Sequence, residues 1–193
     1  TYTLDGEMGN LNLVSSVLHA SNDLVWIGTS QGLFLFNSKN NSFKYYGLNA
    51  EDDRKLNGLN VHCLHAINDT SFLVGYTKYG ADLVTLNTSD YSIETQKIIY
   101  ENSQMEQVEY ATINTFYQDG SDFWAGSFSK GLLKIDLENL TMRPLSEDFP
   151  IIPNVKGIQK GKDGNLWVSS IDGLRSVNPD DLTFYKFSKA WVC

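Results

Sequence analysis

The chain has 193 residues, 41% hydrophobic and 12% aromatic, which is enough to bury a core and too apolar for a disordered chain. It carries 15 Lys and Arg against 23 Asp and Glu, a net charge of −8. This acidic surface argues against a nucleic-acid groove and against direct contact with an anionic membrane. No run of about 18 apolar residues is present, so no membrane-spanning helix is predicted.

A short apolar segment recurs four times along the chain, with Trp at its second position in three copies and Leu73 in the other. The copies are residues 25–28, 72–75, 123–126 and 166–169. A glycine follows each copy after a short polar stretch: Gly32, Gly80, Gly131 and Gly173. An alternating apolar segment comes next, at 33–36, 83–86, 132–135 and 174–177. Gly between two such segments is typical of a β-hairpin turn.

Two further strands complete each copy. A turn rich in Asn and Asp separates the third segment from a fourth, such as 43–46 or 184–187. Another segment precedes the Trp strand, and it is nearly identical in the first two copies, 18–23 and 64–69. Helical periodicity is almost absent, and residues 103–112 are the best helical candidate.

Four antiparallel strands in about 43–51 residues is the size of one β-propeller blade. We therefore predict an all-β fold of four four-stranded repeats, at about 11–46, 58–97, 111–145 and 154–188, within one segment covering 1–193. A β-sandwich also has many short strands, but it would not repeat Trp and Gly at a fixed phase. We assign Trp26, Trp124 and Trp167 to the core between blades, and the four glycines to the turn before the third strand.

Two segments are similar to the two-component regulator propeller repeat. They are Asp163–Leu174, which reads Asp-Gly-Asn-Leu-Trp-Val-Ser-Ser-x-Asp-Gly-Leu, and Trp26–Leu33. The resemblance covers about residues 11 to 188. Leu73 in place of Trp and Ser169 in place of Gly depart from the pattern, as does the wider turn at residues 79–82.

This resemblance implies a periplasmic sensor segment of a hybrid two-component system of Bacteroides type, the extracytoplasmic part of an inner-membrane protein. The ligand it implies is an oligosaccharide, and the parent protein would signal through a histidine kinase that these 193 residues lack. Two alternatives remain: a propeller that serves only as a protein-interaction scaffold, and a propeller lyase or glycosidase. A transmembrane helix and kinase in the parent gene would favour the sensor.

Seven blades are usual in that family, so four blades imply a partial propeller cut from a longer array. Residues 2–4 and 190–192 fit as strands of further blades. Such a fragment would expose two apolar blade faces. The chain could close as a four-bladed ring, two copies could associate, or the open ends could pack on something else. We expect self-association through the open faces.

Candidate chemistry is sparse in the sequence. His62 and His65 lie three apart on a predicted strand, so their imidazoles point to opposite faces, and His19 occupies the equivalent position of the first copy. Cys63 and Cys193 suggest a buried thiol and a chain end. Carboxylates at 51–53, 147–148 and 180–181 fall in predicted turns. We therefore predict no catalytic residue, no metal site and no cofactor.

Propeller ligands usually meet one rim, where the loops between blades and the turns between the second and third strands lie. The loops are expected at about 47–60, 96–111 and 146–154. Sugars favour aromatic faces for their C–H surfaces and charged or amide groups for their hydroxyls. The predicted ligand-binding residues on this rim are Tyr76, Lys78, Tyr79, Phe128 and Lys130.

Overall fold

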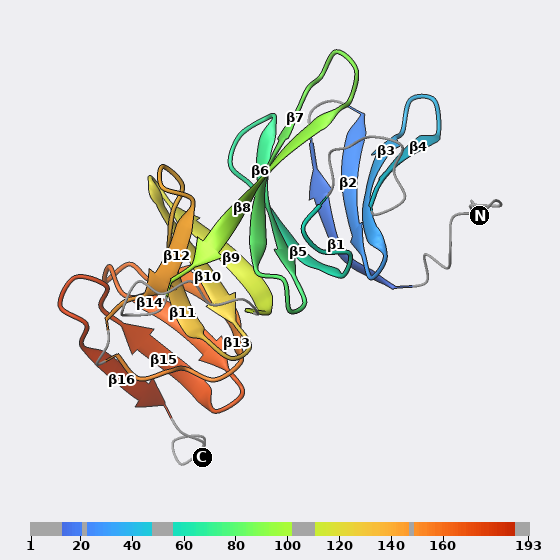
Figure 1. The fold of residues 1–193 in the computed structure, drawn as a ribbon. Helices are drawn as coiled ribbons and strands as arrows, with labels where there is room; N and C mark the ends of the chain where they lie inside the picture. The colour runs from blue at the N-terminus through green and yellow to red at the C-terminus, as the bar shows by residue number, and fades with distance from the viewer. Residues whose placement is uncertain (1–12, 21–22, 48–55, 102–110, 147–148, 188–193) are drawn as a thin grey trace. The chain divides into compact units, whose positions relative to one another are not determined.

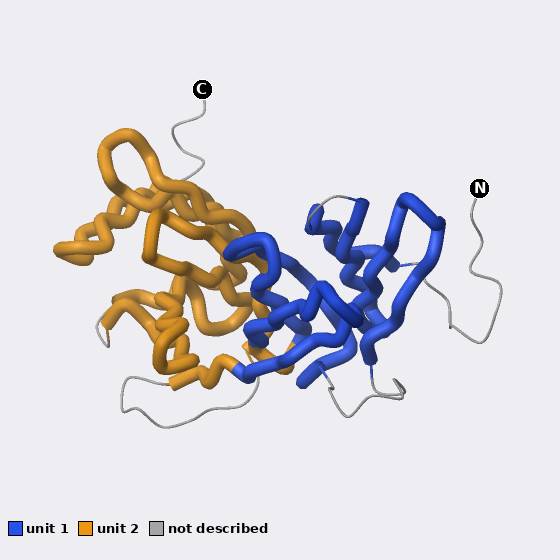
Figure 2. The backbone as a smooth tube through the Cα atoms, turned by 90° about the horizontal axis from the view of Figure 1, so that it is seen from above, with its two compact units in different colours: residues 1–77, 81–97 blue, residues 78–80, 98–193 orange. Residues whose placement is uncertain are grey.

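The computed structural model describes residues 13–20, 23–47, 56–101, 111–146 and 149–187. In these residues every regular element is a β-strand (Figure 1), which confirms the all-β prediction. The same residues contain no helix with the length and apolar character that a membrane crossing requires. The chain divides into two compact units (Figure 2): residues 1–77 with 81–97, and residues 78–80 with 98–193.

The first unit contains two sets of four neighbouring strands in chain order. The first set is a sheet of its own, whereas the second is part of an eight-stranded sheet with the order β5-β6-β7-β8-β12-β11-β10-β9. The first set consists of β1 (Val14–His19), β2 (Leu24–Thr29), β3 (Gly32–Asn37) and β4 (Ser42–Tyr46). The second consists of β5 (Val61–Ala66), β6 (Ser71–Tyr76), β7 (Ala81–Leu86) and β8 (Ile93–Tyr100). Each set is one predicted blade.

The second unit repeats this plan. Its first set consists of β9 (Ile113–Asp119), β10 (Asp122–Ser127), β11 (Gly131–Asp136) and β12 (Thr141–Pro144). Its second consists of β13 (Val155–Lys160), β14 (Leu166–Ser170), β15 (Gly173–Val177) and β16 (Phe184–Phe187). Four four-stranded antiparallel blades are therefore present, as predicted.

One strand continues beyond its expected end. We expected residues 96–111 to form a loop, but β8 extends to Tyr100, and its last residues belong to the second unit. There Ile99 and Tyr100 pair in parallel with Thr141 and Met142 of β12. Burial of Ile98 drives this extension, because only 1% of its surface remains exposed. The helical candidate 103–112 lies mostly outside the described residues, and Ala111 and Thr112 are neither helix nor strand.

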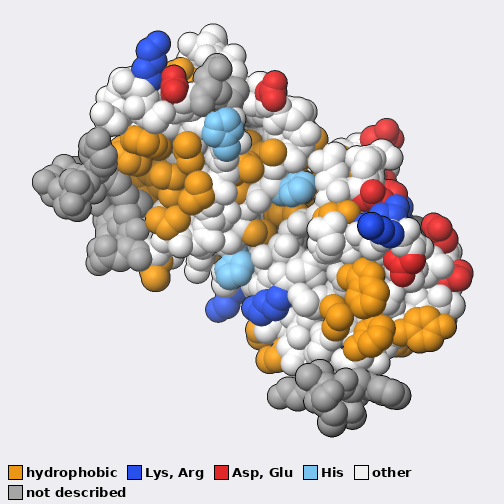
Figure 3. All heavy atoms as spheres, turned by 180° about the vertical axis from the view of Figure 1, so that it is seen from behind, with side chains coloured by type: hydrophobic (Ala, Val, Ile, Leu, Met, Phe, Trp, Pro, Cys, Tyr) orange, Lys and Arg blue, Asp and Glu red, His pale blue; other side chains and the backbone are white. Residues whose placement is uncertain are grey.

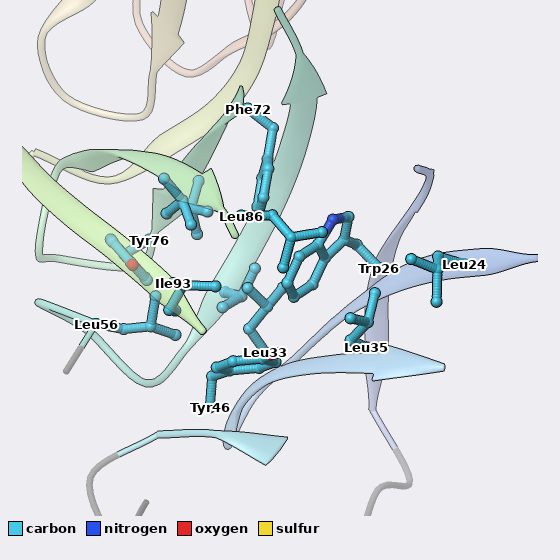
Figure 4. Close-up of a cluster of buried hydrophobic side chains, with 13 residues drawn as sticks. Leu24, Trp26, Leu33, Leu35, Tyr46, Leu56, Phe72, Tyr76, Leu86 and Ile93 are labelled. Carbon is cyan, nitrogen blue, oxygen red and sulfur yellow. The ribbon is translucent and has the colours of Figure 1, made fainter. Parts of the chain in front are cut away.

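The core of the first unit lies between its two blades and is built around Trp26. The indole packs against the ring of Phe72 from β6 at 4.7 Å between centroids and against Tyr46 at 5.4 Å. Figure 4 shows Leu33, Leu86 and neighbouring aliphatic side chains around the same ring. Alternation along β2 points Leu24 and Trp26 toward the next blade, so the Trp is the main contact between the two sheets.

In the second unit, the Trp of the first blade also packs against the following blade. Trp124 of β10 lies in a buried cluster with Val155, Leu166 and Val168 from the following blade. Only 2% of the Trp26 side chain and 3% of the Trp124 side chain is exposed to solvent. Trp167 differs, because it is on the face of β14 opposite Leu166 and is only half-buried, stacked on Phe187 at 5.4 Å. No other described blade covers that face.

The turn between the second and third strand of each blade requires glycine. Gly32, Gly80, Gly131 and Gly173 all have positive φ, between 76° and 135°. A Cβ on Gly32 would also lie 2.8 Å from the carbonyl oxygen of Tyr46. The hydroxyl before the turn completes it, since Thr29 donates to the Gly32 carbonyl and Ser170 donates to that of Gly173. The Thr or Ser of the repeat is thus a local cap.

Within each unit, a hydrogen bond from the first strand of one blade joins it to the first strand of the following blade. Ser15, in a β-bulge of β1, donates to the carbonyl of Val61 at the start of β5. Asn114 of β9 makes the equivalent contact with the carbonyl of Val155 at 2.8 Å. The same slot of the fourth blade holds Lys156, which is exposed.

Two blade faces remain uncovered among the described residues. Val17 is 63% exposed on the first blade, and Leu174, Tyr185 and Phe187 are 39%, 71% and 43% exposed on the fourth. Figure 3 shows hydrophobic side chains gathered over each of these two sheets. Self-association through such faces stays a prediction, which sedimentation velocity can test.

Candidate ligand-binding rim

Four of the five predicted ligand-binding residues lie on one rim of the second unit. Lys78 and Tyr79 belong to the turn after β6, and Phe128 and Lys130 belong to the turn after β10. The Tyr79 and Phe128 side chains are 53% and 56% exposed. This exposure leaves both rings accessible to a ligand, so they are candidates for binding.

Thr112 holds the two turns together. Its side-chain oxygen accepts a hydrogen bond from the backbone N–H of Lys78 at 3.0 Å. Its backbone carbonyl accepts one from the N–H of Phe128 at 2.9 Å. We call the surface formed by Lys78, Tyr79, Thr112, Phe128 and Lys130 the Thr112 rim. The backbones of both turns are therefore fixed to the same residue just before β9.

The turn at Lys78 stores backbone strain. Lys78 has φ of 74°, a conformation that non-glycine residues adopt rarely. The next residue but one, Gly80, donates its N–H to the carbonyl of Ala111 at 2.8 Å, which secures the far end of the turn. This wider turn is the second copy's departure from the repeat pattern, and it is what lifts Tyr79 out of the sheet.

Sequence reasoning missed two residues of this site. Lys130 lies over the ring of Tyr100 at 5.2 Å from its centroid, a cation–π contact that orients the ammonium group. Partial burial raises the pKa of the Tyr100 phenol. Neither Tyr100 nor Thr112 was singled out, because Tyr100 lies in the expected inter-blade loop 96–111 and Thr112 ends the helical candidate 103–112. The alternation of Ile98 and Tyr100 was the signal that could have indicated a strand there.

The structure places Tyr76 in the core of the first unit and away from solvent. Tyr76 is fully buried, and its hydroxyl donates to the Asp82 carboxylate at 2.6 Å. Asn57 donates to the same carboxylate from its backbone N–H at 3.0 Å and from its side-chain amide at 2.7 Å. Tyr76 and Asp82 thus anchor the segment that leads into β5, and Tyr76 offers no surface to a ligand.

Asp82 makes the stability of the first unit depend on pH. Burial raises the pKa of its carboxyl above the ordinary value of about 4, although hydrogen bonds from Tyr76 and Asn57 act in the opposite direction. The folded state then binds the proton more tightly than the unfolded chain does. The stabilisation linked to this proton is complete below pH of about 4 and is lost as the pH rises through the raised pKa.

We expect Asp82→Asn to remove this dependence. Urea unfolding at several pH values between 2 and 8 measures the difference in unfolding free energy between the wild type and the variant, and for Asp82 this difference should fall as the pH rises above about 4. Asp172→Asn is a control of opposite sign. Hydrogen bonds from Ser170 and Lys186 lower the pKa of Asp172 to about 2, so its contribution is lost only as the pH falls below about 4. A wild-type minus Asp82→Asn difference that stays constant would contradict the assignment.

The remaining candidate groups are the cysteines and the carboxylates in turns. Within the described ranges, no group of three or more His, Cys, Asp and Glu side chains is placed to hold a metal ion. Burial raises the pKa of the Cys63 thiol, which makes it a weak nucleophile. Asp181 accepts hydrogen bonds from the backbone and hydroxyl of Thr183, a local turn cap. The carboxylates at 51–53 and 147–148 and the thiol of Cys193 lie outside the described residues.

Comparison with known proteins shows the fold. No family model matches the sequence, and no curated protein is similar to it. The structure is similar to the extracellular domain of BT3049 from B. thetaiotaomicron, a proposed hybrid two-component system, with TM-score 0.73 and 14% identity over 93% of this chain. It is also similar to the extracellular domain of BT4673 from the same organism, with TM-score 0.71 and 13% identity over 93% of this chain. BT4673 is described as a one-component system in one structure and a hybrid two-component system in another.

The chain spans about a quarter of each of these two proteins, 25% in both cases. The β-propeller domain of Cps50 (Swd1) from Myceliophteria thermophila is a further neighbour, with TM-score 0.57, 13% identity, and coverage of 91% of this chain and 58% of that domain. At these identities the similarity shows the propeller fold.

Proposed function

We propose that this chain is a ligand-sensing extracytoplasmic segment of a hybrid two-component sensor and that it binds an oligosaccharide at the Thr112 rim. The similarity to the extracellular domains of BT3049 and BT4673 supports the sensor role. The site is chosen because the rings of Tyr79 and Phe128 are exposed and the backbones of their two turns are both hydrogen-bonded to Thr112. The histidine kinase that receives the signal belongs to a part of the polypeptide beyond these residues.

The chemistry of the rim suits a saccharide. Aromatic rings offer flat apolar faces to the C–H surface of a sugar, and Lys78 and Lys130 offer ammonium donors to its hydroxyl groups. The turn backbones are fixed by hydrogen bonds, so little conformational entropy is lost when a ligand binds. Thr112 directly precedes β9, the first strand of the third blade. A ligand that shifts both turns would therefore also shift β9, and this movement could change how the third blade packs within the unit.

A thermal-shift panel of defined neutral and acidic oligosaccharides tests this proposal. A ligand present at 100 times its Kd should add about 2.7 kcal/mol to the free energy of unfolding. The Tyr79→Ala/Phe128→Ala double variant should lose that stabilisation, because each stacked ring contributes roughly 1 kcal/mol or more. Tyr185→Ala is the matched control, since Tyr185 is 71% exposed in the same unit and lies away from the rim.

The alternatives give different outcomes in the same experiment. A flat response across the panel would contradict the saccharide proposal and favour a protein-interaction scaffold. Cleavage of a panel member, followed by chromatography of the products and abolished by one carboxylate substitution, would instead identify a lyase or glycosidase.

A further inference from the structure

The second unit contains a cavity at the end of β10 opposite the Thr112 rim. Its volume is about 460 Å³, within the usual range for small-molecule sites. Three elements surround it: the start of β10, the hairpin of β11 and β12, and the turn after β15. The side chains used in the argument below are Asp122, Trp124, Lys134, Arg143, Pro179 and Leu182. We call it the β11–β12 pocket.

A row of three residues crosses one wall of this pocket. Trp124, Lys134 and Arg143 are directly opposite one another on β10, β11 and β12, so their side chains share one face of the sheet. Two cations placed opposite each other repel, although water screens the repulsion because both side chains are exposed. The Lys134 ammonium group is 2.9 Å from the Asp122 carboxylate and 5.4 Å from the centre of the Trp124 ring.

Arg143 lacks an equivalent partner. Its side chain is exposed, so water solvates the guanidinium, which also has a Coulombic attraction to Asp136. Within the described part of the chain, Arg143 makes no hydrogen bond or ion pair, so its donors are open to a ligand. The Asp136 carboxylate is occupied by the side-chain amide and backbone N–H of Asn139 and by the N–H of Glu138. Asp122 is likewise paired with Lys134. Both of these carboxylates on the lining are therefore satisfied without Arg143.

The remaining residues that line the pocket fall into an apolar group and a polar group. Pro144, Leu145, Pro179 and Leu182 form apolar surface beside the cation row. Ser121 and Glu138 add hydroxyl and carboxylate oxygens that can bind the hydroxyl groups of a ligand. Glu138 repels negative charge, so a second anionic group on the ligand would be disfavoured near Glu138. An anionic group is favoured only at the Arg143 end of the pocket. A ring with one carboxylate and several hydroxyls matches these three features.

We propose that the β11–β12 pocket binds an acidic monosaccharide unit, with its carboxylate on Arg143 and its ring against Pro179 and Leu182. Guanidinium and carboxylate form two parallel hydrogen bonds, the geometry that Lys134 cannot supply. The choice of a sugar acid rests on the proposed saccharide-sensing function, whereas the position of the site does not, because the pocket and the Thr112 rim are at opposite ends of β10.

Isothermal titration of the whole 193-residue chain tests the proposal with three probes: D-glucuronate, D-glucose and benzoate. Glucuronate should bind, and glucose should bind more than about tenfold more weakly, since it leaves Arg143 without its partner. Benzoate shares the carboxylate but lacks the hydroxyls, so it should also be weaker. Arg143→Gln should reduce glucuronate affinity by more than about tenfold.

Two control variants separate this site from other effects. Lys162→Gln removes a cation outside the lining and should leave glucuronate binding unchanged. The Tyr79→Ala/Phe128→Ala variant should also bind glucuronate normally, so loss at the rim and loss at the pocket are distinguishable. Circular dichroism confirms that each variant is folded. Equal binding of glucose, tighter binding of benzoate, full binding by Arg143→Gln, or no heat with glucuronate at millimolar concentration would each overturn the proposal.

Discussion

Trp26→Ala is expected to lower the free energy of unfolding of the first unit by about 3–5 kcal/mol. Trp26 is 2% exposed and contacts Phe72 of the next blade, so its removal leaves a cavity between two sheets that cannot close without moving one of them (Figure 4). Trp124→Ala should have a similar effect in the second unit, because Trp124 occupies the same position between its two blades. Urea unfolding followed by circular dichroism measures both losses.

Trp167→Ala is the matched control for this prediction. Trp167 has the same place in the repeat, but its face of β14 carries no other described blade and the ring is half-buried. We expect roughly half the loss of Trp26→Ala or less, because less apolar area returns to water and the site can relax. Equal losses at all three positions would contradict the directional packing of the blades.

Gly28→Ala should destabilise the first unit by about 1–3 kcal/mol, a large effect for one methyl group. A Cβ at Gly28 would lie 2.5 Å from Cγ1 of Val61, at the start of the next blade. Val61 is fully buried and cannot move aside without shifting β5. The glycine two residues after Trp26 is thus required by the close approach of the following blade. Gly126, two residues after Trp124, meets Val155 at the same 2.5 Å.

A double-mutant cycle with Val61→Ala tests the cause. Shortening Val61 removes the methyl groups that the new Cβ would meet, so Gly28→Ala should cost clearly less in the Val61→Ala background than in the wild type. Ser169→Gly is the control, since Ser169 occupies the equivalent position of the fourth blade, and it should change stability by no more than about 0.5 kcal/mol. Additive losses in the cycle would show that the Val61 contact is not the reason for the glycine.

Ser169 has a structural consequence of its own. A blade that approached β14 as closely as β5 approaches β2 would meet the Cβ of Ser169. Lys156 also replaces the short polar side chains, Ser15 and Asn114, that bond to the next blade elsewhere. Both substitutions are on the blade whose outer face exposes Tyr185 and Phe187. A blade packed on that face would therefore need a wider spacing than the blades within each unit.

The repeated features were predictable from sequence because they are local. A glycine at positive φ, a hydroxyl cap and alternating apolar residues each depend on a few neighbours in the chain, so Gly32 and Trp26 could be assigned roles from their spacing. The parallel pairing of β8 with β12 joins residues about 40 positions apart, so spacing along the chain could not reveal it. The loop expected at residues 96–111 begins as a strand, which only the short alternation of Ile98 and Tyr100 indicated.

For the candidate site, too, the positions set by spacing in the repeat could be predicted, and those set by contacts between distant residues could not. Lys78, Tyr79, Phe128 and Lys130 share a rim because each follows the second strand of its blade, a position that spacing reveals. Tyr76 is the last residue of β6, and strand alternation directs it into the core of the first unit, where Asp82 binds its hydroxyl. Thr112 and the Trp124–Lys134–Arg143 row could not be found, because they emerge only when three strands are aligned.

Hydrogen–deuterium exchange with the oligosaccharide that gives the largest thermal shift tests the sensor assignment most directly. At a saturating concentration of that sugar, amides of residues 78–80, 111–113 and 127–131 should exchange more slowly than in the unliganded protein, since these segments form and support the Thr112 rim. Protection confined to other segments, or no protection with any member of the panel, would contradict it.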